Sequence, residues 1–241
     1  MIEKDDMPKY LLFLENAFPY MDNYNYHKGM NGIIQELTGL LKTKNIGTDS
    51  DRALLLDFQA TLETKPEKAI KLEKDALAQI ENITADNARL VSNLHANLGG
   101  LYRMNGHPDL AREHMEKSIS LLDQFNLLHI NDSIPQIANY AMFLTEQQEP
   151  ERGISELQKL SGIIKEYHSD DCLDYAKVQE TLGTIYLMTA NLPQAKTHFK
   201  RAFKIYEKIW ADEPEMIKAK YQEIQELYPQ IGFCIGKNLS G

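Results

Sequence analysis

Two asparagines carry the most suggestive binding chemistry in this sequence. Asn97 and Asn139 lie 42 residues apart, and they stand directly before the pairs Leu98-Gly99 and Tyr140-Ala141. A carboxamide offers two donors and an acceptor, which complement the groups of a peptide bond. On neighbouring helices about 10 Å apart, the two amides would hold peptide groups about three residues apart in an extended ligand. The alternative is that both are polar residues on a solvated helix face.

The other reactive residues show no arrangement that predicts catalysis or metal binding. The seven histidines are scattered, and neither an HExxH motif nor a paired metal-ligand spacing occurs. A P-loop, a GxGxxG motif and a GxSxG motif are also missing from the sequence. Cys172 stands at the start of an expected helix with no histidine base placed beside it, which favours a structural thiol. We therefore expect no catalytic residue, no metal site and no cofactor.

Small residues recur at a fixed interval, which indicates a repeating framework. That framework would position the two asparagines. The small residues lie 42 positions apart, at Ala69, Ala111, Gly153 and Ala195. A similar apolar pattern returns around each of them at helical spacing. A period of this length is typical of a repeat array, in which each unit stacks on its neighbours to bury a shared core.

Each repeat is predicted to be a pair of antiparallel helices joined by a short break. The clearest repeat, residues 86–126, breaks at Asn105-Gly106-His107-Pro108. Similar breaks occur at Lys65-Pro66, Gln148-Glu149-Pro150 and Asn191-Leu192-Pro193. Connections this short force antiparallel neighbours. Gly99 and Gly183 should admit the partner helix closely, while larger residues fill the remaining space, namely Tyr102, Tyr186, Met115 and Phe199.

The pattern resembles the tetratricopeptide repeat family, whose signature is W-x2-L-G-x2-Y…A-x3-F. Leu182, Gly183, Tyr186, Ala195 and Phe199 match it well, and Leu98, Gly99, Tyr102 and Ala111 match it with Met115 in the aromatic position. His95 and Gln179 stand where the family has tryptophan. The 42-residue period is similar to the subclass found in kinesin light chains. The resemblance implies that concave asparagines bind a peptide backbone.

The predicted fold class is all-α, a right-handed superhelical solenoid of antiparallel helix pairs. Residues 1–48 are expected to form a degenerate N-terminal helical hairpin that acts as a cap. Residues 49–211 form four repeats of 42 residues. Residues 212–241 form a C-terminal capping helix, with Tyr228 in register, and a mobile tail.

Composition narrows the class of partner and the compartment. The net charge of −9 argues against nucleic acid and against an anionic membrane surface, since both attract clustered Lys and Arg. Hydrophobic residues make up 43% of the chain, but no apolar run approaches the ~20 residues that cross a bilayer. Cys172 and Cys234 belong to no CxxC pair, which favours a reducing cytoplasm.

The sequence therefore predicts a non-enzymatic module that binds a protein or peptide on the concave surface of its first helices. One alternative is the peptide-sensing domain of a bacterial regulator, and another is a scaffold that associates with copies of itself. The candidate binding residues lie on the first helices of the repeats, at Asn93, Asn97, Arg103, Asn139, Met142, Lys177, Glu180, Thr181 and Thr184. In register, the open positions run through Leu55, Asn97, Asn139, Thr181 and Glu223.

Overall fold

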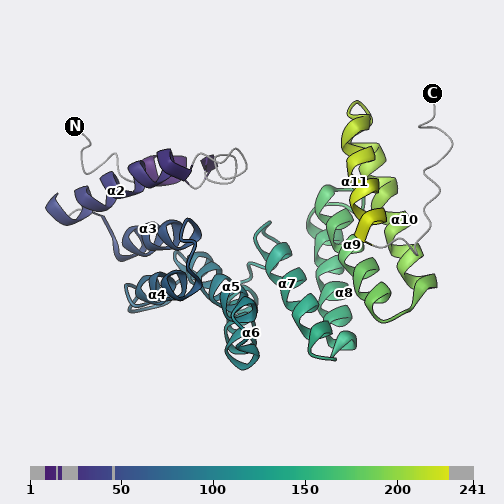
Figure 1. Ribbon diagram of the computed structural model, residues 1–241, viewed down its shortest axis with the longest axis horizontal. Coiled ribbons are helices and arrows are strands. Elements are labelled where there is room, and N and C mark those ends of the chain that lie inside the picture. The colour runs from purple at the N-terminus through teal and green to yellow at the C-terminus, as the bar shows by residue number, and fades with distance from the viewer. Residues whose placement is uncertain (1–8, 15, 18–26, 45–46, 228–241) are drawn as a thin grey trace. The chain divides into compact units, whose positions relative to one another are not determined.

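The computed structural model describes residues 9–14, 16–17, 27–44 and 47–227 (Figure 1). Within those ranges the regular secondary structure is helical and contains no strand, which confirms the all-α class. The chain divides into two compact units, residues 1–127 (unit 1) and 128–241 (unit 2). Cys234, Tyr228 and the tail predicted at residues 236–241 lie outside the described residues.

Unit 1 is a stack of antiparallel helices. Its labelled helices are α2 (His27–Lys44), α3 (Asp49–Thr61), α4 (Pro66–Leu77), α5 (Ala88–Met104) and α6 (Pro108–Gln124). The α3–α4 and α5–α6 pairs form the predicted hairpins, and α4 packs against α5 to join them. A capping box starts α3, since the Thr48 side chain accepts from the Asp51 N–H and the Asp51 carboxylate accepts from the Thr48 N–H.

The N-terminal segment adds its own apolar layer to unit 1. Residues 9–14 and 16–17 are helical, and their Leu11 and Leu14 are buried together with Met30 and Ile34 of α2. The same cluster reaches Leu55 of α3, which is 2% exposed. Leu55 is therefore a core residue and not an open position of the ladder, so that prediction is wrong. Its side chain is needed to cover the segment that precedes the regular repeats.

Unit 2 repeats the same construction. Its helices are α7 (Ser133–Glu146), α8 (Pro150–Tyr167), α9 (Leu173–Met188), α10 (Leu192–Ile209) and α11 (Pro214–Leu227). The α7–α8 and α9–α10 hairpins pack through α8 and α9, and α7 also contacts α9 directly. The first helices α7 and α9 thus form one layer, while α8 lies behind both of them. Phe203 of α10 stacks on Tyr221 of α11 with ring centroids 4.1 Å apart.

Three of the four predicted breaks share one backbone geometry. Gly106, Gln148 and Ala190 follow each other at 42-residue intervals, and all three have positive φ, of 73°, 65° and 59°. The next residue in each turn donates its N–H back across the helix end, as His107 does to the Tyr102 carbonyl at 2.9 Å. Proline then starts the second helix, at Pro108 and Pro150. This combination ends one helix in a left-handed residue and begins the next within a few residues.

Small residues meet where the paired helices cross, as predicted. A Cβ placed on Gly153 would lie 2.6 Å from the Ala141 carbonyl oxygen, so the two backbones touch. A Cβ on Gly183 would lie 2.9 Å from the Phe199 ring. Ala111 and Ala195 are completely buried in the corresponding second helices. Any added volume at these crossings must displace a neighbour, because protein interiors are close-packed.

Candidate ligand-binding surface

The predicted binding residues of unit 2 lie on the layer formed by α7 and α9. Asn139 is exposed on α7, although the adjacent Tyr140 and Ala141 are buried against α8. Lys177 is exposed on α9, and Thr181 and Thr184 are half-buried further along the same helix. With half-buried Met142 of α7, these residues form what we call the first-helix face of unit 2. It consists of Asn139, Met142, Lys177, Thr181 and Thr184.

The first-helix face of unit 2 keeps much of its hydrogen-bonding capacity open. Within the described part of the chain, the Asn139 carboxamide makes no hydrogen bond or ion pair. Lys177 pairs with Asp174 at 3.6 Å, which leaves donors of its ammonium group available. The hydroxyl groups of Thr181 and Thr184 donate to the carbonyls of Lys177 and Glu180, at 3.0 and 3.1 Å, and can still accept.

Glu180, another predicted binding residue, joins three helices of unit 2. Its carboxylate accepts from the Tyr206 hydroxyl of α10 at 2.6 Å and pairs with Lys220 of α11 at 2.8 Å. Burial, followed by the charge of Glu180, raises the pKa of Tyr206 above its usual range. Burial alone would lower the pKa of Lys220, but Glu180 and Glu223 outweigh it and raise the pKa. Through these contacts, Glu180 links α9 to α10 and α11.

The predicted residues of unit 1 already have interaction partners within the chain. Asn97 is exposed on α5, yet its amide donates to the Asp57 carboxylate of α3 at 2.8 Å. Asn93 and Arg103 are half-buried on the same helix and also have partners within the chain. The amide that was expected to reach a ligand from unit 1 is therefore occupied by an internal acceptor.

The two asparagines thus differ in a way that the repeat explains. Asp57, the acceptor for Asn97, has Gly99 as its counterpart 42 residues later. Glycine offers no side-chain acceptor in register with Asn139. Asn97 and Asn139 occupy matching positions in the repeat. Their hydrogen bonding differs because different side chains surround them.

Behind Asn97 lies a buried acid that sequence inspection missed. Glu73 of α4 is 1% exposed, and its Oε2 has no hydrogen-bond partner within the described residues. Burial, together with the negative charge of Asp57, raises the pKa of Glu73 to about 10. The carboxyl is accordingly protonated at neutral pH, and a protonated carboxyl can donate to Asp57. Nothing in the helical spacing of Glu73 distinguishes it from the exposed acids of α4.

The family's tryptophan position is occupied by polar residues that bond across each hairpin. His95 Nδ1 lies 2.9 Å from Nδ1 of His114, and the ring of His114 stacks on Tyr102. The matching pair in unit 2 is Gln179 and His198, joined at 2.9 Å. His198 likewise stacks on its tyrosine, Tyr186. His114 and His198 lie 84 residues apart, which is two repeat periods. The repeat register is therefore the sequence signal that could have revealed these cross-hairpin contacts.

The remaining chemistry of the described residues is structural. Cys172 is the N-cap of α9, where its sulfur accepts from the Tyr175 N–H at 3.5 Å. The described residues contain no group of three or more His, Cys, Asp or Glu side chains that could hold a metal ion. None of the described helices is both long and apolar enough to cross a membrane.

Comparison with known proteins agrees with this helical-pair geometry. Residues 133–208 match the family model described as tetratricopeptide repeat. A search of curated proteins gives no significant match. That match spans the two hairpins of unit 2, and the fold is shared with kinesin-light-chain-like repeats.

Three solved structures illustrate that fold. A Podosopora anserina putative kinesin light chain with nearly identical TPR-like repeats has a TM-score of 0.67 at 13% identity, and the match covers 88% of this chain and 99% of that one. BtubC (BKLC) from P. vanneervenii has a TM-score of 0.56 at 18% identity, covering 84% and 74%. MamA has a TM-score of 0.53 at 15% identity, covering 78% and 94%. At these identities the likeness is one of fold.

Proposed function

We propose that this chain is a non-catalytic scaffold that binds a protein or peptide segment on the first-helix face of unit 2. The observation that carries the proposal is Asn139, an exposed carboxamide that has no partner among the described residues and lies on a helix that contacts α9 directly. If Asn139 had a structural role, its carboxamide would bond to another group of the protein. If it only interacted with solvent, it would need no nearby side chains that could contact the same ligand. Here Lys177 and Thr181 stand on the adjacent helix.

The chemistry of the face favours an extended polypeptide. Asn139 can pair with both the N–H and the C=O of one peptide unit. Lys177 can meet a carboxylate, and Met142 supplies a polarizable apolar contact that adapts to different side chains. The net charge of −9 disfavours a nucleic acid as the ligand.

Selection from a displayed random-peptide library tests this function. Peptides recovered on the full chain should lose about tenfold or more in affinity when Asn139→Ala and Lys177→Ala are combined. The matched control is Gln158→Ala with Lys200→Ala, which removes an amide and a cation that are exposed on the second helices α8 and α10. Equal affinities for both double variants would reject the first-helix face as the binding site.

Light scattering after size-exclusion chromatography separates the scaffold that binds a partner from one that associates with itself. A monomer that binds selected peptides through Asn139 supports the proposal. A stable oligomer that Asn139→Ala dissociates would instead make a second copy of the chain the occupant of this face.

A further inference from the structure

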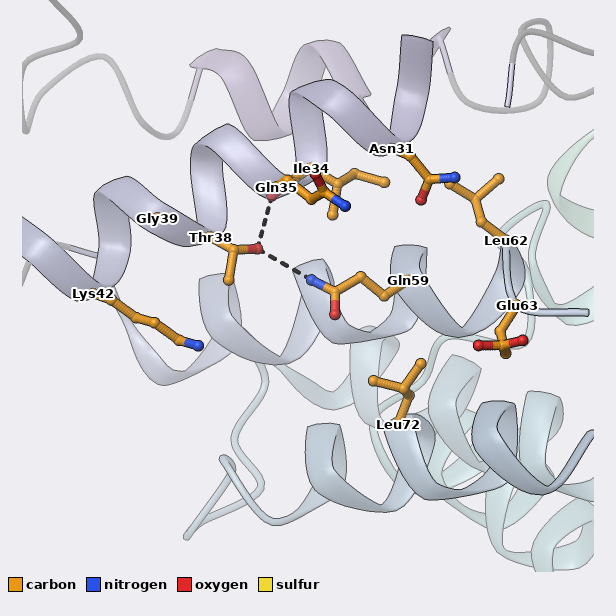
Figure 2. A pocket seen from close by; sticks show the side chains of 10 residues that line it. All are labelled: Asn31, Ile34, Gln35, Thr38, Gly39, Lys42, Gln59, Leu62, Glu63 and Leu72. Carbon is orange, nitrogen blue, oxygen red and sulfur yellow. Dashed lines mark hydrogen bonds between the residues drawn. The ribbon is translucent and has the colours of Figure 1, made fainter. Parts of the chain in front are cut away.

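A polar pocket lies between α2, α3 and α4 of unit 1, so it is built from other helices than the proposed peptide face. Its volume is about 520 Å³. Most of the lining residues are polar, and the aliphatic ones come from three elements, as Ile34 of α2, Leu62 at the end of α3 and Leu72 of α4 (Figure 2). The polar lining residues that matter here are Asn31, Gln35, Thr38 and Gln59.

The pocket walls are held in place by a hydrogen-bond chain. The Thr38 hydroxyl donates to the Ile34 carbonyl at 2.7 Å and accepts from the Gln59 amide at 3.1 Å (Figure 2). The first bond lies within α2 and orients the Thr38 hydroxyl, and the second ties α2 to α3 across the pocket. Asn31 and Gln35 make no side-chain hydrogen bond with the described residues, so their amides are available. Such amides can satisfy the N–H and C=O groups of a polypeptide.

Opposite charges stand at the two ends of the pocket. Lys42 lies at one end, while Glu63 lies beyond Asn31 and Leu62 at the other (Figure 2). A hydrogen bond from the Lys65 N–H lowers the pKa of the Glu63 carboxyl, so Glu63 is ionised at neutral pH. Lys42 forms no ion pair within the described part of the chain. A ligand that spans the pocket therefore meets a cation at one end and an anion at the other.

The length of the pocket sets the size of the ligand. Asn31 and Lys42 are about three helical turns apart on α2, which corresponds to roughly 16 Å. An extended polypeptide advances ~3.3 Å per residue, so about five residues span that distance. Leu72 of α4 lies between the two ends of the pocket, where it can contact one apolar side chain (Figure 2).

We propose that this pocket is a second binding site, which takes an extended segment of about five residues with a free carboxylate at Lys42 and a basic side chain at Glu63. The ligand's peptide groups pair with Asn31, Gln35 and Gln59, and a central aliphatic side chain lies on Leu72. A nucleotide or phosphate ligand is disfavoured, because Lys42 is the single cation among the lining residues and Glu63 repels an anion.

Fluorescence anisotropy with a designed pentapeptide tests the site on the full chain. The probe is Lys-Ala-Leu-Ala-Ala, labelled at its N-terminus and free at its carboxylate. Two further probes carry either a C-terminal amide or norleucine in place of lysine. Each probe is titrated with the wild type and with Lys42→Ala and Glu63→Ala. Lys71→Ala and Glu36→Ala are the matched controls, since both residues are exposed on α4 and α2 but do not line the pocket.

The proposal predicts two specific couplings. Amidation should weaken binding to the wild type about tenfold, but it should cause no further loss in Lys42→Ala. Norleucine should behave in the same way toward Glu63→Ala, and the control variants should bind like the wild type. Circular dichroism of each variant confirms that the helices are retained.

Several outcomes would overturn the proposal. In one, the free-acid and amidated peptides bind the wild type equally. In the second, Lys71→Ala and Lys42→Ala weaken binding to the same extent. In the third, none of the probes binds at millimolar concentration. Free lysine that competes as well as the pentapeptide would also overturn it, because a single amino acid cannot span the pocket. Loss of pentapeptide binding in Asn139→Ala would move the ligand to the first-helix face.

Discussion

Nδ1 of His95 and Nδ1 of His114 lie 2.9 Å apart, across the contact between α5 and α6. One ring must therefore donate its N–H while the other accepts, so the accepting ring has to be neutral. Two repeats later, Gln179 takes the place of His95 and bonds to His198 at the same distance of 2.9 Å. One chain thus contains a titratable and a non-titratable version of the same cross-hairpin contact.

His95→Gln should make the protein less sensitive to mild acid. Burial first, and then the charges of His114 and Lys117, lower the pKa of His95 to about 4. Unfolding exposes His95 with a pKa near 6.5, so its contribution to stability is complete above about pH 6.5 and is lost as the pH falls toward 4. One proton gives at most ~1.4 kcal/mol per pH unit, and partial exposure of the pair reduces this. Urea unfolding between pH 7.5 and 4.5 measures the slope.

His95→Ala separates titration from packing in that experiment. Both variants remove the titrating group, so both should flatten the acid slope. Only His95→Ala also leaves His114 without its bonding partner, and it should be less stable than His95→Gln at pH 7.5 by about 1 kcal/mol. An acid slope that stays unchanged in both variants would mean that His95 is not the sensitive group.

Glu73→Gln should show the opposite dependence on pH. The folded pKa of Glu73 is raised to about 10 by burial and by Asp57, whereas the unfolded side chain ionises near 4.5. Its neutral form is thus fully favourable below pH 4.5, and stability is lost as the pH rises toward 10. Glutamine stays neutral and can still donate to Asp57, so Glu73→Gln should gain on the order of 1–3 kcal/mol at pH 8. Chemical unfolding at pH 5 and pH 8 compares the two proteins.

Glu81→Gln is the control for Glu73→Gln, because Glu81 is exposed in the loop after α4. Its effect should stay within about 0.5 kcal/mol at both pH values. An equal gain for Glu73→Gln at pH 5 and pH 8 would contradict a protonated Glu73.

Two glycines of α8 should respond in opposite directions to alanine. A Cβ at Gly153 meets the backbone of Ala141 at 2.6 Å, and backbone cannot move aside like the end of a flexible side chain. Gly153→Ala should therefore cost about 1–3 kcal/mol. Gly162 has no atom within 4 Å of its added Cβ, so Gly162→Ala should stabilise the helix by about 0.5–1 kcal/mol. Thermal unfolding distinguishes them, and a stable Gly153→Ala would refute the backbone contact.

The turns between paired helices should prefer glycine at their left-handed residue. Ala190 has a φ of 59°, the conformation that Gly106 supplies at 73°. Left-handed geometry costs a residue with a Cβ about 1–2 kcal/mol, partly offset by the lower chain entropy of alanine. Ala190→Gly should thus stabilise unit 2 by about 0.5–1 kcal/mol, and Gly106→Ala should destabilise unit 1 by a similar amount. The midpoints of urea unfolding measure both effects. If Ala190→Gly destabilises the protein and Gly106→Ala stabilises it, the left-handed conformation does not explain the glycine preference.

Lys220 should control how tightly α11 is held. Its ammonium bridges Glu180 of α9 and Glu223 of its own helix, at 2.8 and 3.0 Å, and its side chain is 22% exposed. Lys220→Ala leaves Glu180 half-buried without that cation, so amides of α11 should exchange about tenfold faster. Lys218→Ala is the control, since Lys218 is 55% exposed and pairs only with exposed Glu215. If the amides of α11 exchange at the same rate in both variants, apolar contacts and not Lys220 hold α11 in place.

The repeat period made the helical architecture predictable. Small residues in register with Ala111, and breaks in register with Gly106, repeat often enough to outweigh the missing tryptophan at His95 and Gln179. Helix pairing depends on local spacing and short turns, both of which are visible in a single chain. The contact between Gly153 and Ala141 follows from the same local pattern.

The sequence alone determined which residues repeat, and therefore the helix pairs and the first-helix positions that include Asn97 and Asn139. Only the tertiary structure decided that Asn97 is bonded to Asp57 while Asn139 is open, that Leu55 is core, and that Lys42 and Glu63 close the two ends of one pocket. The physical reason is that a helical period fixes the direction of a side chain on its own helix. The acceptor, charge or apolar surface that the side chain meets comes from another helix, and that helix departs from the repeat at different positions.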